Sequence, residues 1–355
     1  TLLLSDGLVA LKVDEIRGKD IITTIQNSGK MSTKKRVAAP GVSLGLPPIS
    51  EQDAKDIIFG CEQDLDFVAA SFIQRPEDVL AIRKLIEEHN GHMEIMPKIE
   101  NLEGVKNFDA ILEVSDGIMV ARGDLGVEVP AEDVPLIQKE IIRKCNKAGK
   151  PVIVATQMLD SMERNPRPTR AEVSDVGNAI LDGTDAIMLS GETASGDYPV
   201  EAVSTMNRIA CRIEESLEYK NLFVERGFEH SQSRTRAVAH ATVQMAYELD
   251  VPAIITPTDS GYTTKIVSRY RPKAAIVAYT PHEKVVRQLN LRWGVYPILG
   301  TQWKDVDEMI ANAVSASVKD GFVKRGDTTI ITSGIKLQSK TSVGNNTNMI
   351  RVYKI

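Results

Sequence analysis

Charged side chains follow two neighbouring apolar runs of the chain. Lys98 and Glu100 lie at the end of the run 94–99, and Asp124 follows the run 117–121 within the segment ARGDLG. Residues two apart on a strand point to the same side, so Lys98 and Glu100 share one face. Mg²⁺ binds through one or two carboxylates and completes its shell with substrate oxygens and water. The pattern therefore predicts a divalent-metal site at Glu100 and Asp124, beside one lysine. The alternatives are a surface ion pair and a glycine-rich turn with an aspartate cap.

Hydroxyl groups and a third carboxylate follow two further runs. Thr156 ends the run 152–156, and Ser190 and Glu192 come at the end of the run 186–190. A hydroxyl at a strand end can bind substrate or position water, and Ser190 with Glu192 can relay protons. Taken alone, Thr156 is better explained as an ordinary helix-capping residue, and a helix cap explains Ser190 and Glu192 at least equally well.

A hydroxyl-rich loop, TPTDSGYTT, covers residues 256–264 between an expected strand and an expected helix. Backbone N–H groups and hydroxyls at such a position can hold a phosphate. An ordinary capped loop explains the same residues. The sequence contains no P-loop, no GxGxxG and no HExxH.

The elements that must position these residues alternate between strands and helices. Apolar runs without alternation are typical of parallel strands covered on both faces, and they occupy 67–73, 94–99, 117–121, 152–156 and 186–190. Helical patterns separate them, as after Pro76, where acidic residues suit a helix start. Five consecutive βα units indicate a large part of a (β/α)8 TIM barrel, an α/β fold that places its chemistry at the carboxyl ends of the strands.

The flanking regions differ in pattern. Residues 1–43 predict short strands at 2–4, 8–13 and 21–25, and a long helix is expected at 200–219. A polar stretch, 221–232, reads as a linker. The last part predicts a second α/β domain, with strands near 253–256, 275–279, 295–299, 328–332 and 349–353 and helices near 234–249, 262–270, 283–292 and 304–319. We therefore expect domains at 1–43, 44–220 and 221–355.

Composition narrows the class of protein. The 355 residues carry 43 Lys and Arg against 48 Asp and Glu, a formal net charge of −5, which argues against nucleic-acid binding. Hydrophobic residues make up 42% and charged residues 26%, typical of a globular protein. Three widely spaced cysteines give no disulfide framework and fit a reducing compartment. No apolar run suits a membrane span and no secretory signal is visible, so we expect a cytoplasmic protein without membrane contact.

Four segments together resemble the pyruvate kinase family. They are FVAASFIQRPEDV, MPKIENLEGV, SDGIMVARGDLGVEVP and the long stretch from GKPVIVATQML through LSGETASGDYPVEAV. The resemblance extends from residue 1 to 355. It implies a barrel, a β-rich lid at 1–43 and a C-terminal α/β regulatory domain. It also implies a glycolytic phosphotransferase that converts phosphoenolpyruvate and ADP to pyruvate and ATP. Mg²⁺ (or Mn²⁺) and K⁺, a homotetramer and a phosphorylated allosteric effector are further implied.

The resemblance assigns roles residue by residue. Lys98 looks like the lysine that stabilises the moving phosphoryl group, and Glu100 and Asp124 look like the metal ligands. Gly123, Asp124 and Thr156 resemble the site of the substrate carboxylate. Thr156, Ser190 and Glu192 look like members of the family's network that protonates the enolate. Lys35 resembles a nucleotide contact, although its segment TKKRVAAPG departs from the family's KKGVN at Arg36 and Ala38. The effector site is implied at Thr258, Ser260, Gly261, Thr263 and Thr264.

The resemblance also implies that three barrel strands, and the main ligands of K⁺, lie upstream of Thr1. We therefore expect this chain to contain five of the eight barrel strands. It would then be a fragment, and whether the fragment is active by itself is a question for experiment. One alternative is a metal-dependent lyase or aldolase acting on pyruvate-like acids, against which the lid-like first segment and the separate last domain argue. Another is an inactive fragment that binds the effector and oligomerises. A coupled assay for pyruvate separates these hypotheses.

Overall fold

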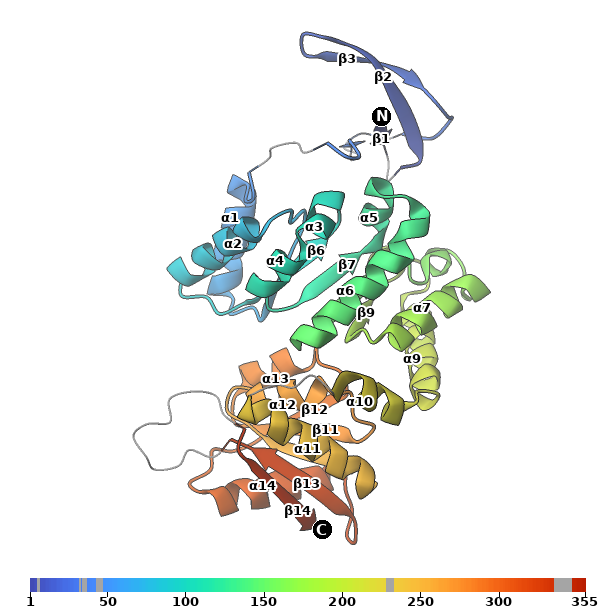
Figure 1. Ribbon diagram of the computed structural model, residues 1–355. Coiled ribbons are helices and arrows are strands. Elements are labelled where there is room, and N and C mark those ends of the chain that lie inside the picture. Colours follow the sequence, from blue (N-terminus) through green and yellow to red (C-terminus); the bar gives the residue numbers. More distant parts are fainter. Residues whose placement is uncertain (5–6, 32, 34–36, 43–46, 228–232, 335–346) are drawn as a thin grey trace. The chain divides into compact units, whose positions relative to one another are not determined.

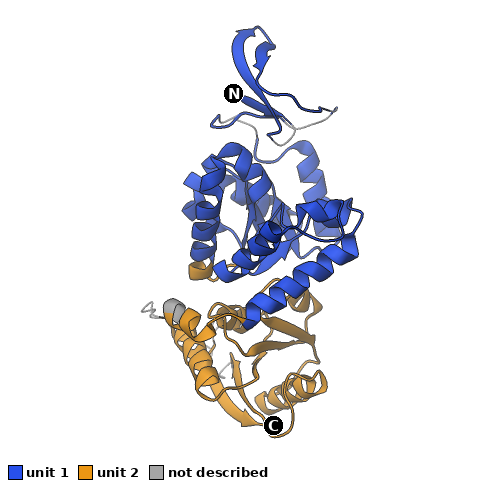
Figure 2. Cartoon of the chain, turned by 90° about the vertical axis from the view of Figure 1, so that its right-hand side faces the viewer, with its two compact units in different colours: residues 1–145, 152–215 blue, residues 146–151, 216–355 orange. Residues whose placement is uncertain are grey.

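A computed structural model of the chain describes residues 1–4, 7–31, 33, 37–42, 47–227, 233–334 and 347–355 (Figure 1). Two compact units share these residues, the first formed by 1–145 with 152–215 and the second by 146–151 with 216–355 (Figure 2). Within the described ranges, no helix is both long and apolar enough to cross a membrane.

The first residues form a small antiparallel sheet of order β3-β2-β1-β4. Its strands are β1 (Leu2–Leu4), β2 (Val9–Arg17), β3 (Asp20–Ile25) and β4 (Val37–Ala38). Gly18 turns the chain between β2 and β3 with a φ of +64°, which glycine adopts without steric cost. The three strands expected here are confirmed, and the second runs four residues further than expected, past an irregularity between Val13 and Glu15.

The centre of the first unit is a five-stranded sheet of order β5-β6-β7-β8-β9, in which every pairing is parallel. Its strands are β5 (Phe67–Ala70), β6 (Glu94–Ile99), β7 (Ile118–Ala121), β8 (Val152–Ala155) and β9 (Ala186–Met188). Every residue of β7 and β8 is buried, as strands covered on both faces require. The five strands expected from the apolar runs are therefore confirmed, with β5 and β9 at the two edges within the described residues.

Helices connect these strands: α1 (Glu51–Glu62), α2 (Pro76–Glu88), α3 (Leu102–Lys106), α4 (Phe108–Val114), α5 (Arg122–Glu128), α6 (Val134–Ala148), α7 (Arg170–Asp182), α8 (Gly191–Ala194) and α9 (Pro199–Glu215). Local signals account for their ends. The Asp78 carboxylate accepts the N–H of Arg75 at the start of α2, and Thr169 and Glu172 form a capping box on α7. Gly183 ends α7 in the left-handed conformation.

Strand register decides which side chains meet at the carboxyl edge. Ala70 pairs with Pro97, Ile99 with Val120, and Ala121 with Ala155. Because the strands are parallel and end nearly level, the residues that follow them emerge side by side. The turn after β5, the end of β6 and the start of α5 are therefore neighbours.

The second unit is a separate α/β sheet of order β12-β11-β10-β13-β14. Its strands are β10 (Ala253–Pro257), β11 (Ala275–Thr280), β12 (Val295–Leu299), β13 (Thr328–Ser333) and β14 (Met349–Lys354), and β14 alone pairs antiparallel. Its helices are α10 (Tyr219–Gly227), α11 (Arg234–Glu248), α12 (Tyr262–Ser268), α13 (Glu283–Leu289) and α14 (Val306–Lys319).

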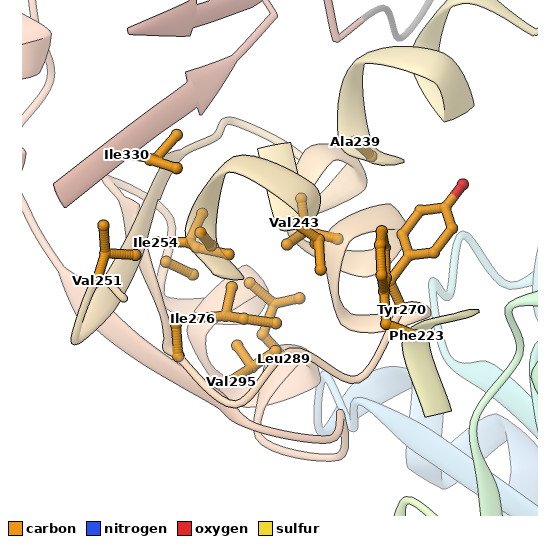
Figure 3. Packing of buried hydrophobic residues seen from close by; sticks show 14 residues of the cluster. Phe223, Ala239, Val243, Val251, Ile254, Tyr270, Ile276, Leu289, Val295 and Ile330 are labelled. Atoms are coloured by element: carbon orange, nitrogen blue, oxygen red, sulfur yellow. The ribbon is translucent and has the colours of Figure 1, made fainter. Parts of the chain in front are cut away.

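Two apolar clusters cover the two faces of this second sheet. Ile254 and Ile276 pack with Val243 and Tyr270 in the cluster of Figure 3, whereas Ile255 belongs to the cluster that contains Met309 and Ile310. Neighbouring strand residues thus enter opposite clusters, which explains the apolar runs without alternation. The expected strands and helices of this region are confirmed to within a few residues.

Two expectations for the segment 200–232 were wrong in detail. The long helix expected at 200–219 ends at Glu215. The segment 221–232, expected to be an irregular linker, is helical up to Gly227 as part of α10. The reason is Phe223, which is only 8% exposed and stacks on His240 at 4.8 Å between ring centroids. The buried Phe223 ring anchors α10, which contains the apolar residues Leu222 and Val224 among polar ones.

Candidate functional site

The end of β6 carries a close ion pair. Lys98 Nζ lies 2.6 Å from Glu100 Oε1, with the lysine side chain 22% exposed and the glutamate 1% exposed. The other oxygen, Glu100 Oε2, accepts the backbone N–H of Phe72 at 2.8 Å. Strand alternation places both side chains on one face, as expected, and the turn after β5 completes the carboxylate's hydrogen bonds.

Burial raises the pKa of the Glu100 carboxyl above its ordinary value. The Lys98 ammonium and the N–H of Phe72 act in the opposite direction, whereas the charge of Asp124 raises the pKa further. A buried carboxylate is costly unless positive charge accompanies it, so this position favours a cation. The charge of Asp124 thus acts on Glu100, so the two predicted metal ligands interact electrostatically.

The donor set fits a hard cation that keeps water or substrate in its shell. In the parts of the chain that the structure describes, no group of three or more His, Cys, Asp and Glu residues could hold a metal ion. Glu100 and Asp124 would supply two carboxylates, and Mg²⁺ at phosphate sites is bound by one or two carboxylates together with substrate phosphates and water. A bound ion would take its remaining ligands from substrate oxygens and water.

The start of α5 meets the loop after β8. The backbone N–H of Gly123 donates to Thr156 Oγ1 at 2.6 Å, and the Thr156 hydroxyl donates to the carbonyl of Ala155 at 2.6 Å. Thr156 and Gln157 both adopt left-handed backbone conformations, with φ of +70° and +54°. Such conformations cost about 1–3 kcal/mol each and persist at functional sites where the surroundings hold them. The structure therefore brings Gly123 and Thr156 together.

A half-buried arginine holds this strained loop. Arg122 donates to the Thr156 carbonyl at 2.8 Å through one terminal nitrogen and pairs with Asp175 Oδ1 at 2.6 Å through the other. The Arg122 side chain is 11% exposed and that of Asp175 37%. Sequence reasoning missed this pair. Arg122 was visible in ARGDLG, but no local signal indicates a partner 53 residues away on α7.

Glu192 holds two loops together. Its carboxylate accepts the N–H of Leu159 at 3.0 Å and the N–H of Ser190 at 2.8 Å, and the residue is 2% exposed. Both oxygens therefore bind backbone groups, one in the loop after β8 and one at the end of β9. This geometry suits a group that orients the Ser190 turn.

The predicted effector residues lie in the second unit. Thr258 Oγ1 accepts the N–H of Gly261 at 3.0 Å, and the Thr263 hydroxyl is 2.8 Å from that of Thr347. Thr258, Thr263 and Thr264 are buried, whereas Ser260 is exposed. Thr258 thus ties the loop internally, whereas Thr263 ties it to Thr347 outside the loop. Lys35, the predicted nucleotide contact, lies outside the described residues.

A parallel βα sheet is followed, at the carboxyl ends of its strands, by a lysine, two acidic residues and a threonine loop with positive φ, an arrangement typical of β/α-barrel proteins. Family models agree with both units: "Pyruvate kinase, barrel domain" matches residues 1–203, and "Pyruvate kinase, alpha/beta domain" matches residues 236–353. The chain belongs to the pyruvate kinase family, and the resemblance drawn from the motifs is confirmed.

Curated relatives match over the whole chain. It is 56% identical over 358 aligned residues to a pyruvate kinase of Bacillus licheniformis and 54% identical over 357 to one of Geobacillus stearothermophilus, covering 60% of each relative. It is 52% identical over 356 residues to a pyruvate kinase of Clostridium acetobutylicum, covering 74% of that relative. The chain therefore spans about three fifths of the length of most of these relatives.

Proposed function

We propose that the full-length protein transfers a phosphoryl group from phosphoenolpyruvate to ADP and releases pyruvate and ATP. The observation that carries the proposal is the Lys98 ammonium, held 2.6 Å from the buried Glu100 at the carboxyl edge of the sheet. The Gly123–Thr156 contact lies on the next two strands of the same edge. Family membership supports the assignment of these residues.

Phosphoryl transfer depends on positioning and on positive charge around the transferring oxygens. Lys98 supplies one such charge from a side chain held at the edge of the sheet. A divalent ion, Mg²⁺ or Mn²⁺, held by Glu100 and Asp124 would add further charge to the same oxygens and fix their orientation. The proposal also includes a K⁺ ion. The β-rich segment 1–43 is assigned as a lid that helps to exclude water, and Lys35 within it is assigned the nucleotide contact.

The substrate carboxylate is assigned to the start of α5. The backbone N–H groups of Gly123 and Asp124, together with the Thr156 hydroxyl, would bind its two oxygens once the Gly123 N–H leaves Thr156 Oγ1 and the Thr156 hydroxyl leaves the Ala155 carbonyl. A negative group there matches oriented N–H donors. The added Cβ of any other residue at position 123 would lie 3.3 Å from Thr156 Oγ1, so glycine permits this close approach.

The second half of the reaction adds a proton to the enolate carbon. Thr156 and Ser190 are the hydroxyls assigned to this step, and Glu192 orients the Ser190 turn through two backbone N–H groups. In the second unit, the loop 258–264 is assigned to a phosphorylated effector, with the exposed Ser260 as its most accessible hydroxyl. We propose that the whole protein works as a homotetramer.

A coupled assay of the full-length protein tests the proposal. Pyruvate formation from phosphoenolpyruvate should require ADP together with Mg²⁺ and K⁺, and should yield ATP in equal amount. Pyruvate released from a larger acid without ADP would favour a lyase or aldolase instead. Effector binding without any turnover would favour the non-enzymatic alternative. Glu100→Gln with Asp124→Asn should lose Mn²⁺ binding measured by calorimetry.

A further inference from the structure

The turn after β5 contacts both charged groups at the end of β6. Ser71 Oγ accepts a hydrogen bond from Lys98 Nζ at 2.9 Å, and the N–H of Phe72 donates to Glu100 Oε2 at 2.8 Å. The pairing of Ala70 with Pro97 brings these residues side by side. Two consecutive residues of one strand end thus hold both members of the ion pair on the neighbouring strand.

The backbone at Phe72 is strained in a way that side-chain packing does not explain. Its φ is +58°, and its side chain is 49% exposed. A bulky residue in the left-handed region is a genuine outlier. What the conformation achieves is a hydrogen bond from its N–H to a carboxylate, and hydrogen bonds of that kind are among the stronger ones in proteins. The turn is therefore built around Glu100 and Lys98.

Ser71 and Glu100 act differently on the lysine. An ammonium group has three N–H donors, and Glu100 Oε1 and Ser71 Oγ accept two of them. The two acceptors fix the direction of the third N–H. Glu100 also neutralises the ammonium charge, whereas the hydroxyl of Ser71 is a neutral acceptor that orients the ammonium and leaves its charge intact.

We propose that Ser71 is a positioning residue that fixes the ammonium of Lys98 for phosphoryl transfer. The inference rests on the function proposed above for Lys98. A lysine side chain is flexible and loses considerable rotamer freedom when it is fixed, so a second, neutral acceptor keeps its charge preorganised. Preorganised charge stabilises a transition state without reorganisation during the reaction. Ser71 contributes this without contacting the reacting atoms.

The first test needs no catalysis. The full-length protein and its Ser71→Ala and Ser71→Thr variants are labelled with trinitrobenzenesulfonate, and the labelling rate of each lysine is measured by mass spectrometry. Lys98 should label about threefold or more faster in Ser71→Ala, because one hydrogen bond is lost. Ser71→Thr should match the parent, and Lys84, which is 77% exposed, should not change. An unchanged rate at Lys98 would overturn the proposal, whether or not the protein turns over phosphoenolpyruvate.

The second test separates positioning from binding. In Ser71→Ala, kcat should fall about tenfold to a hundredfold, the range expected when a charge at the reacting group loses its orientation. The KM for phosphoenolpyruvate should change much less, and Ser71→Thr should restore kcat. The control is Ser315→Ala, an exposed serine on α14. A rise in KM alone, or a threonine variant as impaired as the alanine variant, would contradict the role. No turnover by the parent would contradict the proposed function and leave the labelling result to decide on Ser71.

Discussion

The backbone N–H of Gly123 and the hydroxyl of Thr156 form a 2.6 Å hydrogen bond that joins the carboxyl ends of β7 and β8. One member is a backbone donor at the first turn of α5, and the other is a side chain on a backbone with φ of +70°. The bond closes the space in which we place the substrate carboxylate. Thr156 therefore ties the two strand ends together, and the proposed function assigns its hydroxyl to the substrate carboxylate as well.

Thr156→Val and Thr156→Ser separate the hydroxyl from the shape of the side chain. Valine keeps the branched shape and the strained backbone, but it leaves the N–H of Gly123 without its acceptor and removes one of the donors to the carbonyl of Ala155. We expect Thr156→Val to lower the free energy of unfolding by about 1–3 kcal/mol and to reduce pyruvate formation about tenfold or more. Thr156→Ser should stay close to the parent in both measurements, urea unfolding and the coupled assay. Equal behaviour of the two variants would contradict the role of the hydroxyl.

Lys98→Met tests the charge at the phosphoryl group. Removing a preorganised charge should lower kcat about a thousandfold, equivalent to about 4 kcal/mol of transition-state stabilisation. Methionine keeps the length and apolar character of the stem, so circular dichroism should show the parent fold. Steady-state kinetics of the full-length protein give the answer. Near-normal turnover would refute the assignment of Lys98.

The same variant should make stability depend on pH through Glu100. Burial already raises the pKa of this carboxyl, and loss of Lys98 removes a group that lowers it. When the folded pKa exceeds the unfolded one, the folded state binds protons more tightly, so stability is lost as pH rises from the unfolded pKa through the folded pKa.

We therefore expect Lys98→Met to lose about 3 kcal/mol against the parent at pH 8, the order of magnitude for a broken buried ion pair. The difference should shrink at pH 5. Thermal unfolding at both pH values measures this, and Lys98→Met with Glu100→Gln is the control that should lose most of the pH dependence. A larger deficit at pH 5 than at pH 8 would show that the sign is wrong.

Arg122→Met tests the clamp on the strained loop. The substitution leaves the carbonyl of Thr156 and the carboxylate of Asp175 without their partner, and we expect a loss of about 2 kcal/mol in unfolding free energy. Hydrogen exchange of the amides around Thr156 and Gln157 should become faster. Arg143→Met is the matched control, because Arg143 pairs with Glu140 on the surface of α6 and is 62% exposed. A surface pair of this kind contributes little to stability, so equal losses in the two variants would argue against the clamp.

The loop of the second unit offers a contrast between a buried and an exposed hydroxyl. Thr258→Ala removes the acceptor for the Gly261 N–H and should cost about 1–2 kcal/mol of stability. Ser260→Ala should change stability by no more than about 0.5 kcal/mol. The double variant should weaken activation of the full-length protein by a phosphorylated metabolite and leave the basal rate unchanged. An activation curve equal to the parent's would remove this loop as the effector site.

Strand positions were predictable because each strand of the two α/β sheets is a short apolar run between turn signals. The predicted runs at 94–99 and 295–299 coincide with β6 and β12. The error at 221–232 came from a different balance of forces. Most of the segment is polar, and the ring of Phe223 anchors its helical part by stacking on His240 and packing against Tyr247. Such packing has no local pattern that sequence reasoning could detect.

The sequence by itself determined which residue types follow each strand, and hence that Lys98, Glu100, Asp124 and Thr156 would gather at one edge. Parallel strands of buried residues align their carboxyl ends, so position along the chain is enough for that conclusion. Only the tertiary structure decided the partners within the edge. Ser71 meets Lys98 across 27 residues and Arg122 meets Asp175 across 53. These contacts depend on strand register and on backbone turns with positive φ at Phe72, Thr156 and Gln157, and both arise only when the packed sheet holds the chain in conformations that it would not adopt alone.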